Sequence, residues 1–307
     1  MNELAFLKKI LFQVIPSLLI LTFIIFCLVY VAGDPASMML PENATAADRE
    51  ALRESLGLNE PFLTQYTAFL GDLIRGDFGT SLQYQQPATD LVLSRLTATL
   101  SLSLIAMFIA IVISIPLGIY AALKRNTVLD FLISGVSIVG KAMPNFWIGI
   151  MLILFLAVIF PIFPVSGASS PLHFVLPAFT LGIALAAEMT RLTRASVLEV
   201  IEQEFVQTAR AKGQKERIVI GKHVFLNALI PIVTIIGLQF PQLIGGAIVV
   251  ETVFSWPGIG RLLLTAMENS DMAVVQAIVF VIAFITITVN LLTDLLYRVL
   301  DPRIKYD

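Results

Sequence analysis

Long apolar runs alternate with short charged segments along most of the chain. Six runs are long enough to cross a bilayer as helices, each of which needs about 20 residues. They cover approximately Ile10–Ala32, Leu96–Leu123, Phe131–Phe160, Leu172–Thr190, Val224–Val250 and Ala273–Leu296. Prolines interrupt several runs, which membrane helices tolerate where neighbouring helices satisfy the freed carbonyl groups. The pattern predicts an all-α integral membrane protein with six transmembrane helices.

Lysine and arginine orient these helices, because cytoplasmic loops carry an excess of both residues. Most of the 20 Lys and Arg residues lie in the segments before the first run, after the second, after the fourth and after the sixth. They are Lys8, Lys9, Lys124, Arg125, Arg191, Arg194, Arg210, Lys212, Lys215, Arg217, Lys222, Arg298, Arg303 and Lys305. We therefore expect both termini in the cytoplasm, with an uncleaved first helix rather than a signal peptide.

Composition agrees with a membrane protein and excludes several other classes. The chain is 57% hydrophobic and only 14% charged, whereas soluble domains are close to a quarter charged. The net charge of −2 gives no basis for a nucleic-acid partner, and lipid is the expected surroundings. The single cysteine, Cys27, excludes an intrachain disulfide.

The segment 33–94 between the first two runs is too long for a simple turn. It holds a helical pattern over Ala46–Leu56, with Thr45 as a candidate N-cap, and a second apolar and aromatic pattern over Phe62–Ile74. We expect a small extracytoplasmic subdomain here, with a mere connector as the alternative. The predicted organisation is therefore residues 1–32 (N-terminus and first helix), 33–94, a five-helix core over 95–300 and a cytoplasmic tail, 301–307.

The sequence contains no complete motif for catalysis or for nucleotide binding. The stretch Gly135–Ala142 approaches a phosphate-binding loop, but Ala142 stands where a Ser or Thr would hold Mg²⁺. His173 and His223 fall on opposite sides of the predicted membrane and have no Cys or Glu at ligand spacing. We expect no catalytic residue, no metal site and no cofactor bound by this chain.

A charged island, Glu204–Pro231, separates the fourth and fifth apolar runs. Its small residues Ala209, Ala211 and Gly213 allow another molecule to pack closely. We predict a short amphipathic helix over Glu199–Lys215 that packs Phe205, Val206 and Ala209 on one side. Gly213 would end this helix in a left-handed turn. Arg210, Lys212 and Lys215 would face water or acidic groups of a partner, and a solvated basic loop without a docking role is the alternative.

Four segments in order along the chain resemble one known family, the membrane permeases of ABC importers, and within it the first permease of the dipeptide, oligopeptide and nickel group. They are Gly33–Ala36, Gly76–Ser81, the triplet Gln207-Thr208-Ala209 with Gly213 four residues after it, and Glu251–Gly260. Gln207 stands where the family's wider pattern has Glu, a departure common in the peptide group.

The resemblance implies partner chains that carry out the functions for which this chain has no residues. These are a second, homologous permease, two ATPase subunits that bind ATP and Mg²⁺, and an extracytoplasmic substrate-binding protein, all at a bacterial or archaeal inner membrane. The cargo would be di- or oligopeptides, glutathione, or nickel or a metal chelate. The segment of about 199–216 would be the coupling helix, whose docking residues would be Glu204, Phe205, Thr208, Ala209, Arg210, Ala211, Lys212 and Gly213.

Polar residues inside the predicted helices are candidates for the transport pathway. Lys141 is about 16 Å into the third run, at 1.5 Å per residue, where a lone ammonium group indicates a cavity or a partner. It could contact a substrate carboxylate, pair with Glu188 or Asp294, or extend along a wide lumen. Asn145, Gln239 and Gln242 are further pathway candidates, with hydrogen bonding between helices as the alternative role.

A self-sufficient carrier or channel driven by an ion gradient is the competing function. Such carriers often show inverted repeats and intramembrane acids. This sequence has no evident repeat and very few acids within its apolar runs. A membrane enzyme is a more distant alternative, for lack of any catalytic constellation.

Overall fold

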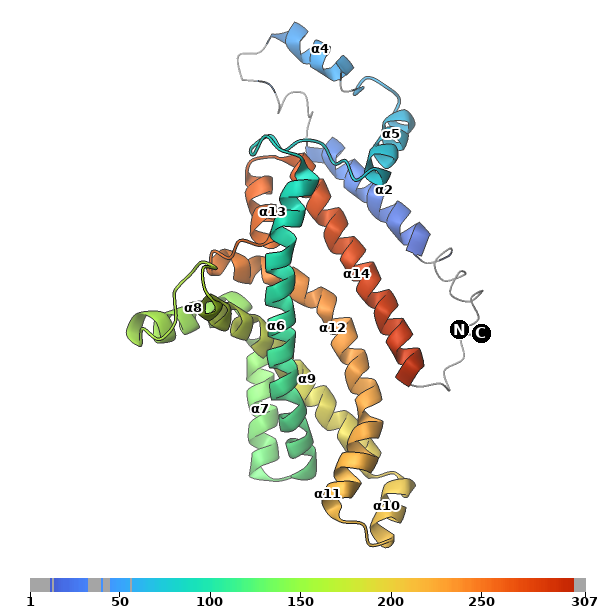
Figure 1. Ribbon diagram of the computed structural model, residues 1–307, viewed down its shortest axis with the longest axis vertical. Helices are drawn as coiled ribbons and strands as arrows, with labels where there is room; N and C mark the ends of the chain where they lie inside the picture. Colours follow the sequence, from blue (N-terminus) through green and yellow to red (C-terminus); the bar gives the residue numbers. More distant parts are fainter. Residues whose placement is uncertain (1–11, 13, 33–39, 41–44, 56, 301–307) are drawn as a thin grey trace. The chain divides into compact units, whose positions relative to one another are not determined.

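The computed structural model describes residues 12, 14–32, 40, 45–55 and 57–300. The described part is almost entirely helical (Figure 1). Its helices are α2 (Ile15–Ala32), α4 (Ala46–Ser55), α5 (Phe62–Ile74), α6 (Ala88–Leu123), α7 (Val128–Ala142), α8 (Asn145–Ile153), α9 (Val175–Ile201), α10 (Glu204–Ala211), α11 (Glu216–Ile218), α12 (Leu226–Val253), α13 (Ile259–Glu268) and α14 (Met272–Leu300). Leu154–Ile159 and Val219–Phe225 are π-helical, and Pro171–Phe174 forms a 3₁₀ turn. Contacts divide the chain into two units.

The first unit contains residues 1–97 and 262–287. In it, α2 packs on α5 through aromatic side chains, with Phe26 contacting both Phe62 and Tyr66. The predicted N-cap of α4 is confirmed: the Asp48 amide donates to Thr45 Oγ1, and the Asp48 carboxylate accepts from the Thr45 amide. The second pattern forms α5 with the predicted bounds.

The loop between α5 and α6 in this unit carries the segment Gly76–Ser81. Gly76 and Gly79 both have positive φ, 76° and 86°, a conformation that glycine adopts without steric cost. The loop ends on a buried contact in which Ser81 Oγ donates to Asp271 at 2.5 Å. A serine and an acid 190 residues apart therefore fix this loop.

The second unit contains residues 98–261 and 288–305. Its core is built around α9, which packs against α7, α8 and α12. Gly182 of α9 permits close packing on α6, since a Cβ there would lie 2.7 Å from the carbonyl oxygen of Ala106. Gly246 also faces a neighbour, Leu181, whereas a Cβ at Gly245 would meet nothing within 4 Å.

The predicted third span is interrupted at one of its prolines and is not one straight helix. The chain breaks between α7 and α8, and the two halves are bent by 101°. Met143 is extended (φ −78°, ψ 132°) because the residue before a proline is disfavoured in the helical region, and Pro144 then precedes α8. A continuous apolar run therefore contains a sharp corner.

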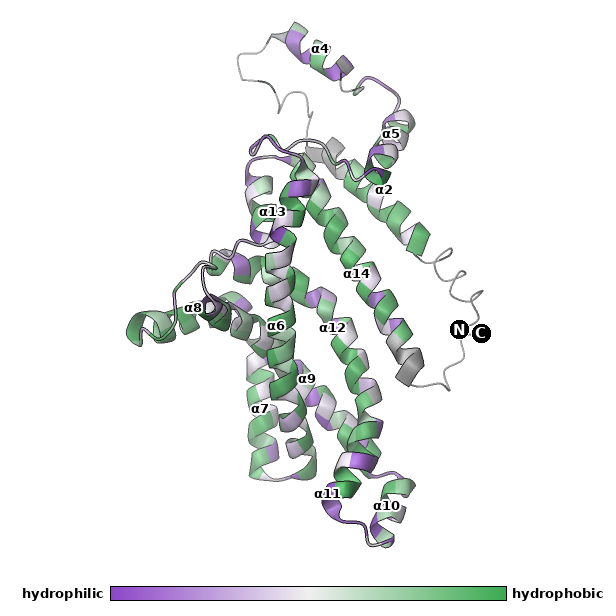
Figure 2. Ribbon diagram, viewed as in Figure 1, coloured by the Kyte–Doolittle hydropathy of each residue, from purple (hydrophilic) through white to green (hydrophobic). Residues whose placement is uncertain are grey.

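Four helices in the described ranges are long and apolar enough to cross a membrane, and the bent pair would make a fifth. A shorter apolar stretch, Ile15–Cys27 within α2, lies in the range of the predicted first span. Figure 2 shows the apolar character along α6 and α14 and the polar character around α10 and α11. Lys8, Lys9, the segment Gly33–Ala36 and the tail 301–307 also lie outside the described residues.

Candidate functional site

The structure contains a short helix within the range predicted for the amphipathic helix, but it is shorter than expected. α9 continues to Ile201, so it takes up the start of the predicted range Glu199–Lys215. A break at Glu202 and Gln203 follows, and α10 then covers only Glu204–Ala211. The fourth apolar run thus ends on a helix that extends well past Thr190 toward the charged island.

α10 is held to the rest of its unit by a narrow apolar stripe. Val206 and Ala209 are buried together with Val219 and Val224, as expected for residues three apart on one helical face. Phe205 does not join them and is 44% exposed, which corrects the predicted packing side. Ala209, one of the candidate docking residues, therefore packs inside this chain.

The exposed part of α10 holds the other candidate docking residues. Glu204, Phe205, Thr208, Arg210 and Ala211 are exposed, as is Gln207, and exposed Lys212 and Gly213 follow. Glu204, Thr208 and Ala211 recur at positions i, i+4 and i+7, so they form one row opposite the buried stripe. We call this row, with Phe205 beside it, the outer face of α10.

Gly213 ends the helical segment as predicted. Its φ is +73°, its amide donates to the carbonyl oxygen of Arg210 at 2.9 Å, and the next amide, Gln214, donates to Ala209 at 3.3 Å. A Cβ at position 213 would meet nothing within 4 Å. The left-handed backbone conformation, and not a lack of space, therefore favours glycine here.

Arg210 forms an ion pair within the chain, with Glu216. Its Nη2 lies 2.8 Å from Glu216 Oε1, and its Nε donates to Glu216 Oε2 at 3.3 Å. Hydrogen bonding from the guanidinium lowers the pKa of the Glu216 carboxyl, and the same contact raises the pKa of Arg210. This pair closes the turn around Gly213 and leaves Lys212 and Lys215 as the exposed cations of the turn.

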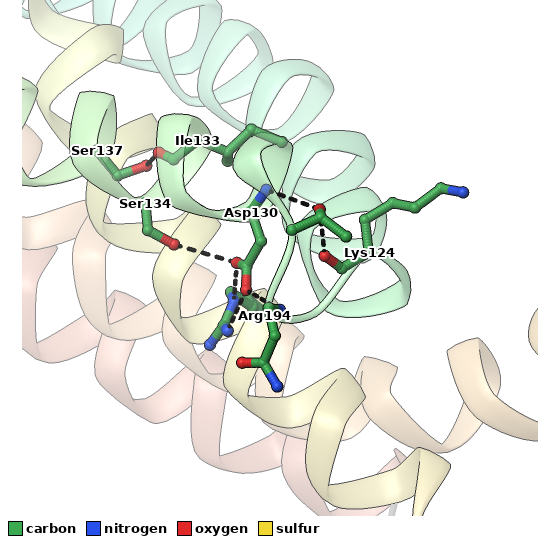
Figure 3. A network of polar contacts seen from close by, with 8 residues as sticks. Lys124, Asp130, Ile133, Ser134, Ser137 and Arg194 are labelled. Carbon is green, nitrogen blue, oxygen red and sulfur yellow. Dashed lines mark hydrogen bonds and ion pairs between the residues drawn. The ribbon is translucent and has the colours of Figure 1, made fainter.

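Two ion pairs connect the region around the α6–α7 loop to α9 and to the break that follows it. Arg125 bonds to Glu202 at 2.6 Å, at the break just before α10. Asp130, in the first turn of α7, accepts two hydrogen bonds from Arg194, at 2.6 and 2.8 Å (Figure 3). The Asn126 amide also donates to Asp130. Sequence reasoning missed Asp130, because nothing in the local pattern links it to an arginine 64 residues away.

The four candidate pathway residues come together, although they lie on three helices. Lys141, Asn145, Gln239 and Gln242 line one pocket of about 180 Å³. Lys141 stands in the last turn of α7, beside the corner with α8, rather than within a continuous helix as its expected depth assumed. Its ammonium group lies 3.1 Å from Glu188, so one of the predicted pairings is present.

A second pocket of about 350 Å³ shares Lys141 and Glu188 with the first. Its further lining includes Ser134, Arg191 and Arg194. Arg194 is occupied by Asp130. The Lys141–Glu188 pair therefore stands between a pocket lined by amide side chains and one lined by arginines.

Another buried acid organises the segment Glu251–Gly260. The Glu251 carboxylate accepts hydrogen bonds from Thr99 Oγ1 at 2.5 Å and from the Arg261 amide at 3.0 Å, at the start of α13. Thr99 Oγ1 in turn accepts from the amide of Ile259. A carboxylate at a helix N-terminus satisfies amides that have no partner within the helix. Glu251 therefore fixes the turn between α12 and α13.

The phosphate-loop-like stretch and the two histidines lie in ordinary structural positions. Gly135–Ala142 forms the second half of α7, so its amides are engaged in a helix rather than open to a phosphate. His173 contacts Ser170 through Nδ1, and His223 contacts Gln214 through Nε2. Among the described residues, no group of three His, Cys, Asp or Glu side chains is placed to hold a metal ion.

Comparisons with known proteins agree over nearly the whole chain. Residues 114–306 match the family described as the binding-protein-dependent transport system inner membrane component, and residues 3–103 match the N-terminal part of such components. The chain is 40% identical over 304 residues to the oligopeptide transport system permease protein AppB of Bacillus subtilis, covering 95% of this chain and 96% of that protein. It is 41% identical over 302 residues to the glutathione transport system permease protein GsiC of Pectobacterium atrosepticum, covering 98% of each.

Solved structures are similar in fold. The inward-facing MetNI methionine ABC transporter matches with a TM-score of 0.59 at 16% identity, over 69% of this chain and 96% of that one. An amino acid ABC transporter matches with a TM-score of 0.53 at 20% identity, over 68% and 94%. The family is thus indicated by sequence, and its helical fold by structure.

Proposed function

Because this chain belongs to the family of inner membrane components of binding-protein-dependent transport systems, we propose that it is a permease subunit of an ATP-driven importer of peptides. The observation that carries the proposal is about 40% identity along almost the entire chain to permeases for oligopeptides and for glutathione. Di- and oligopeptides and glutathione are the proposed cargoes, with nickel or metal chelates as a further class in the resemblance.

The proposed assembly divides the work among several chains. This chain and a second homologous permease form the pathway, two ATPase subunits hydrolyse ATP with Mg²⁺, and an extracytoplasmic protein delivers the cargo. The chain itself is non-catalytic and lies in a bacterial cytoplasmic membrane with six spans and both termini inside. The basic residues around α10, which orient that side toward the cytoplasm, support this topology.

α10 is the proposed coupling helix. Its outer face presents Phe205, Thr208 and Ala211 to an ATPase groove, while Val206 and Ala209 anchor the helix to its own chain. The Arg125–Glu202 ion pair joins the loop between α6 and α7 to the break just before α10, and the Asp130–Arg194 ion pair joins α7 to α9. Closure of the ATPase dimer would then move these helices as rigid bodies and change access to the pathway.

The pocket of Lys141, Asn145, Gln239 and Gln242 is the proposed part of the pathway in this chain. Polar side chains within membrane helices are costly unless they pair or face a cavity, and these line a cavity together. Their neutral amides can donate and accept hydrogen bonds, which suits a cargo that contains peptide groups.

Reconstitution of the complete complex into liposomes tests the proposal. Uptake of labelled dialanine, pentaalanine and glutathione is measured with the binding protein outside and ATP inside. We expect uptake of at least one of these cargoes that depends on ATP and stops when either the binding protein or the ATPase subunits are left out. Uptake by this chain alone, driven by a proton or sodium gradient without ATP, would instead establish the ion-coupled carrier.

A further inference from the structure

The Lys141–Glu188 ion pair differs from the other ion pair between the same two helices. Asp130 and Arg194 bond through two contacts, and their side chains are only 8% and 27% exposed. Lys141 and Glu188 join through a contact of 3.1 Å, and their side chains are 50% and 31% exposed. The Asp130–Arg194 pair is therefore largely buried, whereas the Lys141–Glu188 pair is partly exposed and lines a pocket.

An open lysine–carboxylate pair is easy to exchange. Lysine carries a compact charge on a flexible stem, whereas arginine binds a carboxylate in a fixed two-pronged geometry. Partly solvated pairs contribute little to folding stability, so the pair can separate at low cost when each charge receives a new partner. Both charges remain accessible from the pockets that they line.

We propose that Lys141 and Glu188 bind the two charged ends of a peptide cargo, with the lysine taking the terminal carboxylate and the glutamate taking the terminal ammonium. This inference rests on the proposed function and deepens it by naming the charge pattern of the cargo. The ion pair between the two side chains is exchanged for two ion pairs with the peptide, so no charge is left without a partner.

The lining of both pockets supports this arrangement. Asn145, Gln239 and Gln242 supply neutral donors and acceptors next to the pair, as the backbone of a peptide between two charged ends requires. Arg191 lines the neighbouring pocket, while Arg194 is neutralised by Asp130. The positive charge of Arg191 favours a carboxylate bound in that pocket.

Direct binding to the complex of the two permeases and the ATPases, without the binding protein, tests the inference. The cargo from the reconstitution experiment is titrated in four forms: with both ends free, N-acetylated, C-amidated, and blocked at both ends. Omitting the binding protein removes its own preference for free ends. We expect the free form to bind about tenfold more tightly than either singly blocked form, as hydrogen bonds to charged groups allow.

Two single variants test which side chain binds which end of the peptide. Lys141→Met should weaken binding of free peptide about tenfold and leave binding of the C-amidated form nearly unchanged. Glu188→Gln should do the same for free peptide while sparing the N-acetylated form. Lys124→Met is the matched control, because the Lys124 side chain points away from the nearby polar network (Figure 3) and its removal should change none of the four affinities.

The double variant Lys141→Met with Glu188→Gln separates cargo binding from a structural role. It removes both charges together, so it should fold and bind all four forms with equal, weak affinity. Equal losses for all four forms in the single variants, with recovery in the double variant, would show a purely structural pair and overturn the inference. That result would leave ATP-driven uptake by the wild type, and hence the proposed function, intact. If the wild-type complex imports none of the cargoes, both proposals fail.

Discussion

Asp130 at the start of α7 and Arg194 on α9 are joined by two hydrogen bonds of 2.6 and 2.8 Å (Figure 3). Three turns further along α7, Lys141 meets Glu188 at an earlier position of α9. The two helices therefore run antiparallel and are tied near both ends of α7. One tie lies near the segment that leads to α10, and the other lies in the polar pocket.

Replacing Asp130 with Asn should destabilise the protein. The change leaves the guanidinium of Arg194 without its charged partner, and breaking a buried pair costs about 3 kcal/mol or more. Because Arg194 is partly exposed, we expect the loss of stability to lie at the low end of that range. Thermal inactivation of the purified complex measures it, with Lys124→Met as the control for an exposed charge. Equal inactivation temperatures for Asp130→Asn and wild type would show that the pair does not hold α7 to α9.

Replacing Gly213 with alanine should weaken the turn after α10. A left-handed conformation costs a residue with a Cβ about 1–2 kcal/mol, while the open space around this position excludes a clash. We expect Gly213→Ala to lower ATP-driven uptake and Gly213→Asn to lower it less, since asparagine tolerates this conformation. Gly221→Ala, also in open space but without positive φ, is the control and should transport normally.

The Arg210–Glu216 pair should make the turn after α10 sensitive to acid. The pKa of Glu216 is lowered in the folded chain, so its stabilising contribution is present above the ordinary glutamate pKa of about 4.3. That contribution is lost as the pH falls through the lowered value. Hydrogen exchange of residues 210–218 should therefore accelerate below about pH 4, once corrected for the intrinsic pH dependence of exchange. The effect should be small, because both side chains are substantially exposed.

Glu216→Gln provides the comparison for this pH effect. The variant should show faster exchange already at neutral pH and little further change on acidification. A wild-type turn whose corrected exchange does not respond to acid would show that the pair does not stabilise it.

Close packing of α6 on α9 can be tested with two glycines. Gly182→Ala places a Cβ 2.7 Å from the carbonyl oxygen of Ala106, and overpacking of this kind costs about 1–3 kcal/mol. Gly245→Ala adds the same methyl group where no atom lies within 4 Å. Thermal inactivation should separate the two variants, with only Gly182→Ala losing stability. Similar behaviour of both would place the helices farther apart than described.

Features set by local chemistry were predictable from the sequence. The cap at Thr45, the bounds of α5 and the left-handed turn at Gly213 each depend on residues close together in the chain. The pairing of Lys141 with Glu188 was one of three alternatives for a charge in an apolar run. The cost of burying a charge does not distinguish this pairing from a substrate contact or from extension along a lumen.

Features set by packing were not predictable in the same way. Pro144 marks the break between α7 and α8, but the hydropathy of the apolar run does not show in which direction the chain turns there. Phe205 and Val206 are adjacent in sequence, and only the contacts of α10 determine that Val206 is buried while Phe205 is exposed. The partner of Asp130 depends on how α7 and α9 pack, which no local pattern encodes.

The most direct test of the account is whether the outer face of α10 joins this chain to an ATPase. Ala211→Glu adds a charged side chain to that face without touching the buried stripe, and Ala51→Glu makes the same change at an exposed position of α4. We expect the Ala211 variant to reach the membrane but to lose both ATPase co-purification and ATP-driven uptake, while the Ala51 variant keeps both. Normal ATPase binding and uptake by Ala211→Glu would contradict the proposed role of α10.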